Sequence, residues 1–407
     1  MGDQNKNVPR LRFPGYTDAW VERTFFDNIK NIIDFRGRTP KKLGMNWSDT
    51  GYLALSALNV KNGYIDPEAD AHYGNQELYD TWMTGKELHK NQVLFTTEAP
   101  MGNVAQVPDN KKYILSQRVI AFDVKEDKIA EDFLATILRS PKTFNELSAL
   151  SSGGTAKGVS QKILARMKIV VPNSLDEQIK IGSSLSLFDK IIDLHQEELL
   201  KLKNLKKSYL GKMFPKNGSD IPELRFPGYT DAWVKCEFAT FIERINISSD
   251  SDLIPKVEFE DIKSGMGYLN KDISRKFDDR KGTLFQPKDI LFGKLRPYLK
   301  NWLFPDFTGV ALGDFWVFRA LNSNPEFAYV LIQSPKFQAI ANDTAGTKMP
   351  RSDWKIVSNS EFWMPSIKEQ TKIGEFFKHL DNLITVNERE LNKLKELKKS
   401  YLKNMFV

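Results

Sequence analysis

The sequence predicts an α+β protein: two mixed α/β domains in a tandem pseudo-two-fold duplication, separated by an antiparallel coiled coil of two long helices. Three observations indicate this fold. A nine-residue segment occurs twice without a change, each copy ends in a near-identical heptad stretch, and the residues between those ends diverge around a shared skeleton. A chain of 407 residues is long enough for two or three domains of ordinary size.

Matching segments mark the two ends of each copy. Arg-Phe-Pro-Gly-Tyr-Thr-Asp-Ala-Trp begins the copies at residues 12–20 and 225–233. Leu-Lys-x-Leu-Lys-Lys-Ser-Tyr-Leu-x-x-Met-Phe closes them at residues 202–214 and 394–406. The two copies keep the same end segments but differ in the residues between those ends. Such a protein is expected to recognise two different targets with one fold.

The closing segments are predicted to belong to long helices. From about residue 175 to 213, and again in the second copy, apolar residues recur in alternating steps of four and three without a proline. Such heptad spacing is typical of a coiled-coil seam, and the duplication favours antiparallel pairing inside the chain. His195 and Asn387 hold equivalent seam positions, where we expect one polar layer that fixes the register. The alternative is that both side chains merely tolerate solvent at a loose seam.

The residues between the ends are predicted to form strands followed by a short helix. Strands are expected at residues 92–96, 104–107, 113–115 and 119–124, and in the second copy at 289–292, 301–304 and 315–320. Helices are expected at Glu131–Ser140 and Glu326–Ser334, each ended by Ser-Pro because proline disfavours the continuation of a helix.

Composition restricts the classes of function. Hydrophobic residues make up 41% and charged residues 27%, so each domain can bury a core. No apolar run reaches the length of a membrane span, and residues 1–13 lack the apolar stretch of a secretory signal. The single cysteine, Cys236, fits a reducing compartment, so a soluble cytoplasmic protein is expected. The net charge of +7 is compatible with a polyanionic partner, but it is also common in other soluble proteins.

Loops at equivalent positions of the two domains carry different polar side chains. Residues 35–42 place four cations around a glycine and a proline, and residues 116–118 place an amide beside a guanidinium, which suits adenine and guanine edges. Residues 293–300 stand where the first copy has residues 96–103. For any single cation, ordinary solvated surface is the alternative. The residues expected to contact DNA are Arg36, Arg38, Thr39, Lys41, Lys42, Thr97, Glu98, Asn103, Gln117, Arg118 and Lys157 in the first copy, and Lys294, Arg296, Tyr298, Lys300, Lys348 and Arg351 in the second.

A nuclease is the competing interpretation. Pro108-Asp109 and Glu126 with Lys128 fit the proline-acid and acid-x-lysine pattern that holds Mg²⁺ in many nucleases. The second copy keeps Pro305-Asp306 but has Ser-Asn-Pro at 323–325 in place of the second acid and the lysine. A turn explains both copies, whereas a metal site explains one. We therefore predict no catalytic residue, no metal site and no cofactor, and neither a dinucleotide motif nor a P-loop occurs in the sequence.

Several segments carry a family resemblance. They are Pro-x-Leu-Arg-Phe-Pro-Gly-Tyr-Thr-Asp-Ala-Trp at 9–20 and 222–233, Glu-Gln-x-Lys-Ile-Gly at 177–182 and 369–374, and the segments 92–103, 117–118 and 289–298. In this order, and duplicated, they resemble the specificity subunits of type I restriction-modification systems, and the resemblance spans essentially all 407 residues.

The resemblance implies a non-catalytic DNA-binding subunit. Each variable domain would recognise one half of a bipartite, asymmetric site in double-stranded DNA, and the paired helices would fix the spacer. Two methyltransferase subunits using S-adenosylmethionine would dock, ATP-dependent restriction subunits would join them, and no membrane would be involved. A coiled-coil scaffold between two protein-binding domains and a stand-alone Mg²⁺-dependent nuclease remain as alternatives. The expected boundaries are a repeat motif at 1–20, target recognition domain 1 at 21–172, a conserved long helix at 173–214, a linker with the repeat motif at 215–234, target recognition domain 2 at 235–365 and a second long helix at 366–407.

Overall fold

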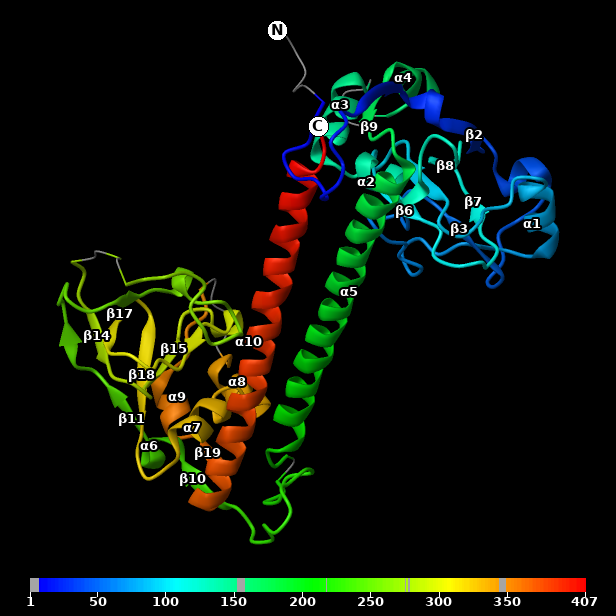
Figure 1. Ribbon diagram of the computed structural model, residues 1–407. Helices are drawn as coiled ribbons and strands as arrows, with labels where there is room; N and C mark the ends of the chain where they lie inside the picture. Colours follow the sequence, from blue (N-terminus) through cyan, green and yellow to red (C-terminus); the bar gives the residue numbers. More distant parts are fainter. Residues whose placement is uncertain (1–6, 152–157, 217, 275, 277–278, 344–348) are drawn as a thin grey trace. The chain divides into compact units, whose positions relative to one another are not determined.

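The computed structural model describes residues 7–151, 158–216, 218–274, 276, 279–343 and 349–407. The chain forms two compact units: unit 1 comprises Met1–Leu194 with Leu391–Val407, and unit 2 comprises His195–Glu390. Two long helices, α5 (Leu175–Lys212) and α10 (Ile367–Asn404), run unbroken from one unit into the other (Figure 1). Each unit therefore combines one mixed α/β part with a portion of both long helices.

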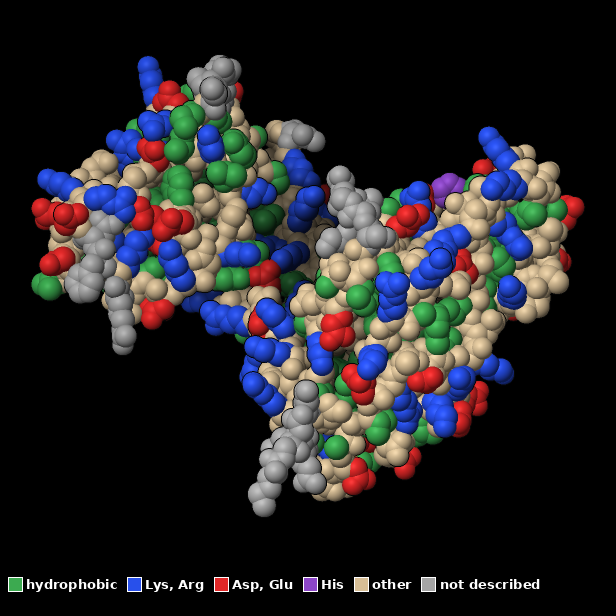
Figure 2. Space-filling view, turned by 90° about the horizontal axis from the view of Figure 1, so that it is seen from above, with side chains coloured by type: hydrophobic (Ala, Val, Ile, Leu, Met, Phe, Trp, Pro, Cys, Tyr) green, Lys and Arg blue, Asp and Glu red, His purple; other side chains and the backbone are tan. Residues whose placement is uncertain are grey.

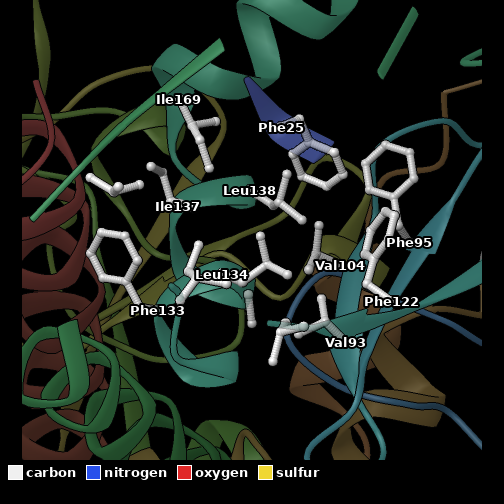
Figure 3. Close-up of a cluster of buried hydrophobic side chains, with 14 of the residues drawn as sticks. Phe25, Val93, Phe95, Val104, Phe122, Phe133, Leu134, Ile137, Leu138 and Ile169 are labelled. Carbon is white, nitrogen blue, oxygen red and sulfur yellow. The ribbon is translucent and has the colours of Figure 1, made fainter. Parts of the chain in front are cut away.

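The central sheet of unit 1 is a four-stranded antiparallel sheet in the order β2-β8-β5-β6. Its strands are β2 (Ile29–Asp34), β8 (Val119–Val124), β5 (Val93–Thr96) and β6 (Val104–Gln106). Strand β5 is buried on both faces, and alternate residues enter different cores because side chains of a strand alternate between its faces. Val93 and Phe95 join one core, which Figure 3 shows against helix α2, and Leu94 joins the other.

Smaller elements complete unit 1. A three-stranded sheet has the order β4-β3-β7, and a two-stranded antiparallel ribbon pairs β1 with β9. These strands are β4 (Tyr73–Gly74), β3 (Tyr52–Leu55), β7 (Ile114–Leu115), β1 (Val21–Thr24) and β9 (Lys168–Val171). The helices are α1 (Gln76–Met83), α2 (Glu131–Leu138), α3 (Pro141–Leu150), α4 (Gln161–Arg166) and the 3₁₀ turns η1 (Phe25–Asn28) and η2 (Pro40–Leu43).

Unit 2 repeats this plan. Its central sheet has the order β11-β18-β15-β16, and a ribbon pairs β10 with β19, so both correspond strand for strand to unit 1. A second four-stranded sheet has the order β12-β14-β17-β13. The strands are β10 (Val234–Glu237), β11 (Ile242–Ile245), β12 (Ser248–Ser249), β13 (Lys256–Val257), β14 (Gly282–Phe285), β15 (Ile290–Gly293), β16 (Trp302–Leu303), β17 (Gly309–Ala311), β18 (Phe315–Ala320) and β19 (Glu361–Met364). The helices are α6 (Phe238–Phe241), α7 (Pro325–Leu331), α8 (Pro335–Ala341), α9 (Trp354–Ser358) and the 3₁₀ turns η3 (Phe259–Asp261) and η4 (Pro297–Leu299).

The long helices pair in antiparallel fashion within each unit, which confirms the predicted coiled coil. Each has 38 residues and is about 57 Å long at about 1.5 Å per residue. In unit 2, Lys206 forms an ion pair of 2.5 Å with Asp381, and further along α5 the ring of Tyr209 lies 5.0 Å from that of Phe376. In unit 1, Asp189 pairs with Lys398. The aspartates occupy equivalent positions in the two copies, as do the lysines, so one ion pair is used twice.

The repeated nine-residue segment joins two helix ends in each unit. The guanidinium of Arg12 donates two hydrogen bonds, of 2.6 and 2.9 Å, to the carboxylate of Glu177 in the first turn of α5. The Trp20 ring packs with its centroid 6.3 Å from that of Phe406, just after α10 ends. In unit 2, Arg225 bonds Glu369 at 2.7 and 2.8 Å, and Trp233 packs on Phe214. The near-identity of the ends therefore reflects contacts that each unit has to make.

The predicted polar layer at His195 and Asn387 stays a prediction. Asn387 is buried, but among the residues that the structure describes its Oδ1 has no hydrogen-bond partner, and the same holds for Nδ1 of His195. Both residues fall in unit 2, which begins at His195. Buried polar atoms without partners destabilise a helix pair, so their retention at equivalent positions still favours a role in register.

Sequence reasoning stopped short at two places. The predicted helices end at Leu138 and Leu331, shortly before Ser140-Pro141 and Ser334-Pro335. A new helix starts at each Ser-Pro pair, because the serine hydroxyl caps it and the proline occupies its first turn. Strands β2 and β11 of the central sheets were also not predicted. In the small sheets only β7 coincides with a predicted strand, since several of the other strands have only two residues. In the part of the chain that the structure describes, none of the helices has the length and apolar character that crossing a bilayer requires.

Candidate nucleic-acid interface

The predicted contact residues of unit 1 meet where two loops adjoin the central sheet. We call this place corner 1; it consists of Thr97 and Glu98 after β5, Arg118 before β8, and Gly158. The backbone N–H of Thr97 donates to the carbonyl of Arg118 at 2.8 Å, and Glu98 forms an isolated bridge with Gly158. The corner is therefore held by main-chain bonds, which leaves its side chains free to vary.

Corner 1 presents an exposed ion pair. Nε of Arg118 lies 3.0 Å from Oε1 of Glu98, and the two side chains are 55% and 47% exposed. Arg118 has φ of +65°, a left-handed conformation that few non-glycine residues adopt. An ion pair this exposed to solvent contributes little to stability. Each of the two groups can therefore leave the other and bind a different partner at small cost in free energy.

A cavity of about 420 Å³ adjoins corner 1. It brings together two loops that are distant in sequence, residues 38–41 and 116–118. The amide of Gln117 donates to the carbonyl of Arg38, and this bond ties the two loops to each other. Five of the predicted contact residues line the cavity: Arg38, Thr39, Lys41, Gln117 and Arg118. Further polar lining that sequence reasoning missed comes from Asn46, Ser56, Asp70 and Ser116.

Some predicted residues also hold the loops in place. The Arg38 guanidinium lies 4.5 Å from the Phe35 ring centroid and donates to the carbonyl of Trp82. Arg36 is bonded to Asp34; burial acts to raise the pKa of that carboxyl, but hydrogen bonds from Arg36 outweigh it and hold the pKa below its usual value. Lys42 donates to the Gly37 carbonyl. These contacts give the cationic loop a defined conformation.

Thr97 and Asn103 also serve the loop structure. Thr97 is 2% exposed, and its hydroxyl bonds the Arg118 carbonyl at 3.2 Å. The Asn103 amide donates to the carbonyl of Val60 at 2.9 Å. Neither side chain is therefore free for a base edge in this conformation. Two further predicted residues, Lys157 and Lys348, lie outside the described residues.

Unit 2 builds the same corner with different side chains. Corner 2 consists of Lys294 and Leu295 after β15, Asp314 before β18, and Arg351. The N–H of Lys294 donates to the Asp314 carbonyl at 2.8 Å, and Leu295 forms an isolated bridge with Arg351. Both main-chain contacts match those of corner 1. Asp314 Oδ2 lies 2.9 Å from Arg351 Nη2, and Asp314 Oδ1 lies 3.8 Å from Lys294 Nζ.

Three further predicted residues of unit 2 lie on the loop that follows Leu295. Arg296 and Lys300 flank the short turn η4 and both have left-handed φ angles, +49° and +56°. Tyr298, within that turn, is 55% exposed. Sequence reasoning missed Asp314, although it stands where the duplication places Arg118 of the first copy. Aligning the residues before β8 and β18 would have found it.

The predicted turn explains the proline-acid segment of unit 1. Asp109 Oδ1 accepts hydrogen bonds from the Lys111 N–H at 2.9 Å and from the Tyr113 hydroxyl at 3.0 Å. Burial and this bond to Asp109 raise the pKa of Tyr113 to about 12. Asp109 is thus engaged in closing a turn. Among the residues that the structure describes, no group of three or more His, Cys, Asp or Glu is placed to hold a metal ion.

Each unit thus carries exposed loops with variable side chains on a fixed main-chain frame, and this defines a binding protein with two recognition domains. The family profile of the type I restriction modification DNA specificity domain matches residues 26–204 and 264–396. The chain belongs to this family and contains its domain twice.

Relatives agree with this assignment. The chain is 24% identical over 355 residues to the type I restriction enzyme MjaVIII specificity subunit of Methanocaldococcus jannaschii, a match that covers 79% of this chain and 80% of that protein. The fold of this chain is similar to that in the crystal structure of the type I restriction-modification system S subunit from M. genitalium. The TM-score is 0.66 and the sequence identity is 15%, over 98% of this chain and 99% of that one.

Proposed function

We propose that the chain is the DNA-specificity subunit of a type I restriction-modification complex, in which each unit recognises one half of a bipartite, asymmetric DNA site. One observation carries the proposal: corners 1 and 2 share their main-chain bonds but differ in every charged side chain. A common fold with different polar groups at one place is what recognition of two different half-sites requires. The exposed cations around both corners suit the polyanionic backbone of DNA.

The predicted contact residues divide into two proposed roles. Phosphate contacts position a protein on DNA, whereas contacts to base edges give specificity. We assign Lys41, Lys42 and Lys300 to phosphates, because their side chains are exposed and Lys41 lines the cavity beside corner 1. We assign Arg118 to a base edge, because its exposed guanidinium matches guanine. Gln117 is assigned to holding the loops that carry the interface, since its amide donates to the Arg38 carbonyl. The domain boundaries at 21–172 and 235–365 are proposed to delimit the two DNA-recognition domains.

The long helices are proposed to receive the partner subunits. Each unit exposes large apolar side chains on the long helices: Leu187 and Leu194 on α5 and Leu397 on α10 in unit 1, and Leu205 on α5 with Leu383 and Val386 on α10 in unit 2. Leu194 and Val386 are equivalent residues of the two copies. Exposed apolar groups at helical spacing suit a helical partner, and we propose that two methyltransferase subunits using S-adenosylmethionine dock there. ATP-dependent restriction subunits would join them, and methyl transfer and cleavage would belong to these partners in the cytoplasm.

The decisive experiment maps methylated bases genome-wide in cells with and without this chain, with the methyltransferase subunit present in both. The expected result is one bipartite motif that disappears when the chain is removed. A scaffold protein would leave the methylated motif unchanged. A nuclease would instead cut DNA as the purified chain with Mg²⁺, and Asp109→Ala would abolish that cutting.

A second experiment tests whether the paired helices fix the spacer. Seven residues, one heptad, would be inserted after Leu194 in α5 and after Glu390 in α10, where the two units divide. Each helix then grows by about 10 Å, which corresponds to roughly three base pairs of DNA. The spacer is expected to change while both half-site sequences stay the same. An unchanged spacer in a complex that still methylates would exclude the helices as its determinant.

A further inference from the structure

We infer that the ion pair of each corner recognises one G·C base pair, with the arginine on the guanine and the carboxylate on the cytosine. This inference rests on the proposed function. It assigns Arg118 with Glu98 to one half-site and Arg351 with Asp314 to the other. It therefore adds Asp314 to the residues proposed to contact bases. Asp314 occupies the position of Arg118, although its charge corresponds to that of Glu98.

The two corners hold opposite charges in equivalent places. In corner 1 the residue before the long strand is the cation Arg118, and the acid Glu98 stands on the loop after β5. In corner 2 the residue before the long strand is the acid Asp314, and the cations Lys294 and Arg351 stand on the facing loops. The main-chain bonds are the same in both, so the residue before the long strand has opposite charge in the two corners. Its partner is Glu98 on the loop after β5 in corner 1, whereas in corner 2 it is Arg351, which occupies the place of Gly158.

A paired cation and carboxylate are complementary to a G·C base pair. In the major groove, guanine offers two adjacent acceptors, N7 and O6, and cytosine offers an amino donor. A guanidinium donates to the first, and a carboxylate accepts from the second. At corner 1 the residue before the long strand, Arg118, faces guanine, whereas at corner 2 the equivalent residue, Asp314, faces cytosine. When the two units are superimposed, guanine of the second base pair therefore lies on the DNA strand that carries cytosine in the first. The inference therefore predicts a reversed base-pair orientation in the second half-site.

The same pairs are poorly suited to phosphate. A carboxylate 2.9 to 3.0 Å from the arginine repels a phosphate group, whereas an isolated lysine or arginine does not. Lys and Arg side chains are interspersed with Asp and Glu on the visible surface of both units (Figure 2), so selectivity has to come from such local groupings. Phosphate contacts are better supplied by cations such as Lys300, for which no acidic partner appears among the described residues.

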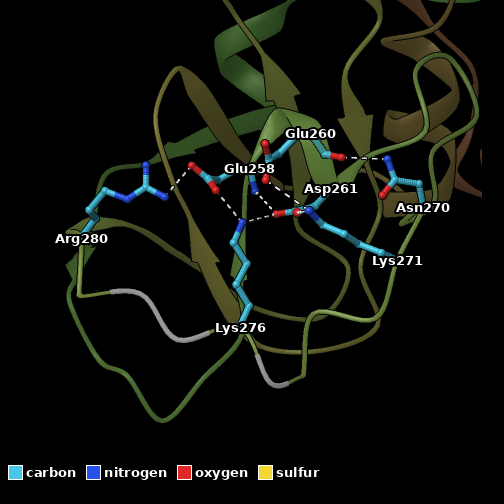
Figure 4. Close-up of polar contacts among 7 residues, drawn as sticks. All are labelled: Glu258, Glu260, Asp261, Asn270, Lys271, Lys276 and Arg280. Carbon is cyan, nitrogen blue, oxygen red and sulfur yellow. Dashed lines mark hydrogen bonds and ion pairs between the residues drawn. The ribbon is translucent and has the colours of Figure 1, made fainter.

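Exposure separates the corner pairs from structural ion pairs. Figure 4 shows the charged cluster around Asp261 in unit 2, where Lys271 and Lys276 each lie 2.8 Å from its carboxylate. Asp261 is fully buried, so opening that cluster leaves an uncompensated charge. Arg118 and Arg351 are 55% and 60% exposed, and their pairs can open toward a base edge at little cost.

The test measures the methylated motif of the complex containing each variant. Arg118→Ala is expected to make one G·C position of one half-site degenerate, with methylation of sites altered at that position rising about 5- to 150-fold relative to the unaltered site. The other half-site is expected to stay unchanged. Arg351→Ala and Asp314→Asn should act only on the second half-site. Arg118→Lys keeps the charge but loses the bidentate geometry, and should relax the same position with little loss of DNA affinity.

Matched controls are available in both units. Lys168 pairs with Glu22 at 3.0 Å on the β1-β9 ribbon, and Lys235 pairs with Glu361 at 2.7 Å on the β10-β19 ribbon. These pairs are equally exposed and also reversed in charge, but they lie on regular strands, so Lys168→Ala and Lys235→Ala should leave the motif intact. A uniform loss of methylation for Arg118→Ala without any change of motif would show a phosphate contact and overturn the inference. Relaxation at an A·T position would overturn it as well. Absence of any motif with the unaltered chain would instead refute the proposed function.

Discussion

Replacing Arg12 with methionine should loosen the start of α5 and leave the start of α10 intact. Arg12 donates two hydrogen bonds, of 2.6 and 2.9 Å, to Glu177, whose side chain is only 2% exposed. The indole N–H of Trp20 adds a third contact at 3.3 Å. Methionine fills much of the same space but supplies no charge, so the substitution leaves a carboxylate buried without its cation.

The expected cost is about 3–5 kcal/mol, the usual range when one partner of a buried ion pair is removed. Arg12 is itself 11% exposed, so little water can replace it beside the carboxylate. Because the chain has two units, one unfolding free energy does not describe the whole chain, so unfolding is followed for each unit separately. The effect at a single helix end is measured locally. Hydrogen exchange of the amides in the first turns of α5 reports this loss, while the equivalent turns of α10 serve as an internal reference.

Three variants make the measurement decisive. Arg225→Met removes the equivalent partner of Glu369 and should give the mirror result, with faster exchange at the start of α10. The double variant Arg12→Met with Glu177→Met removes both charges and should recover much of the lost protection. Arg10→Met alters an exposed arginine nearby and should change nothing. If Arg12→Met leaves exchange in α5 within about threefold of the unaltered protein, the repeated segment does not hold the helix end as described here.

Four other substitutions test the packing of the long helices. Gly182→Ala should destabilise unit 1 by about 1–3 kcal/mol in urea unfolding, because a Cβ there would come within 2.6 Å of the α2 backbone, whereas Gly211→Ala meets no close atom and should stabilise by about 0.5–1 kcal/mol. Gln178→Leu should cost about 2–4 kcal/mol by the same measurement, since its amide bonds three main-chain groups that would lose their partner. Burial raises the pKa of Asp381 against the opposing effect of Lys206, so the folded state holds this proton more tightly than the unfolded chain. The contribution of Asp381 to stability is then present below its ordinary pKa of about 3.9 and is lost as pH rises through the raised pKa. In the variant Asp381→Asn, urea midpoints measured over a series of pH values should no longer show this loss.

The frame of the fold could be predicted from the sequence because its signals are regular. Heptad spacing predicted both long helices, and the structure confirms their antiparallel pairing within each unit. Apolar runs predicted three of the four strands in each central sheet to within one or two residues, for example 93–96 and 119–124, but they did not predict β2 or β11. These elements are long or buried enough for periodicity to be visible.

The candidate interface was harder to predict, since it depends on contacts between distant segments. The residues next to Asn103 in the sequence do not indicate that its amide bonds the Val60 carbonyl. Because of this bond, Asn103 is not available to contact a base. The cavity beside corner 1 likewise requires residues 38–41 and 116–118 to fold against each other. Asp314 was not predicted because its equivalence to Arg118 becomes visible only when the residues before β8 and β18 are aligned.

The distribution of ion pairs explains why the two copies kept their ends and changed their loops. Arg12 with Glu177 and Arg225 with Glu369 are buried, so loss of either partner is costly and both pairs persist. Arg118 with Glu98 is exposed and contributes little to folding, so its position could take an acid in the other copy without loss of stability. The main-chain bonds of the corners do not depend on side-chain identity. New recognition chemistry can therefore arise at the corners while the frame that supports them stays fixed.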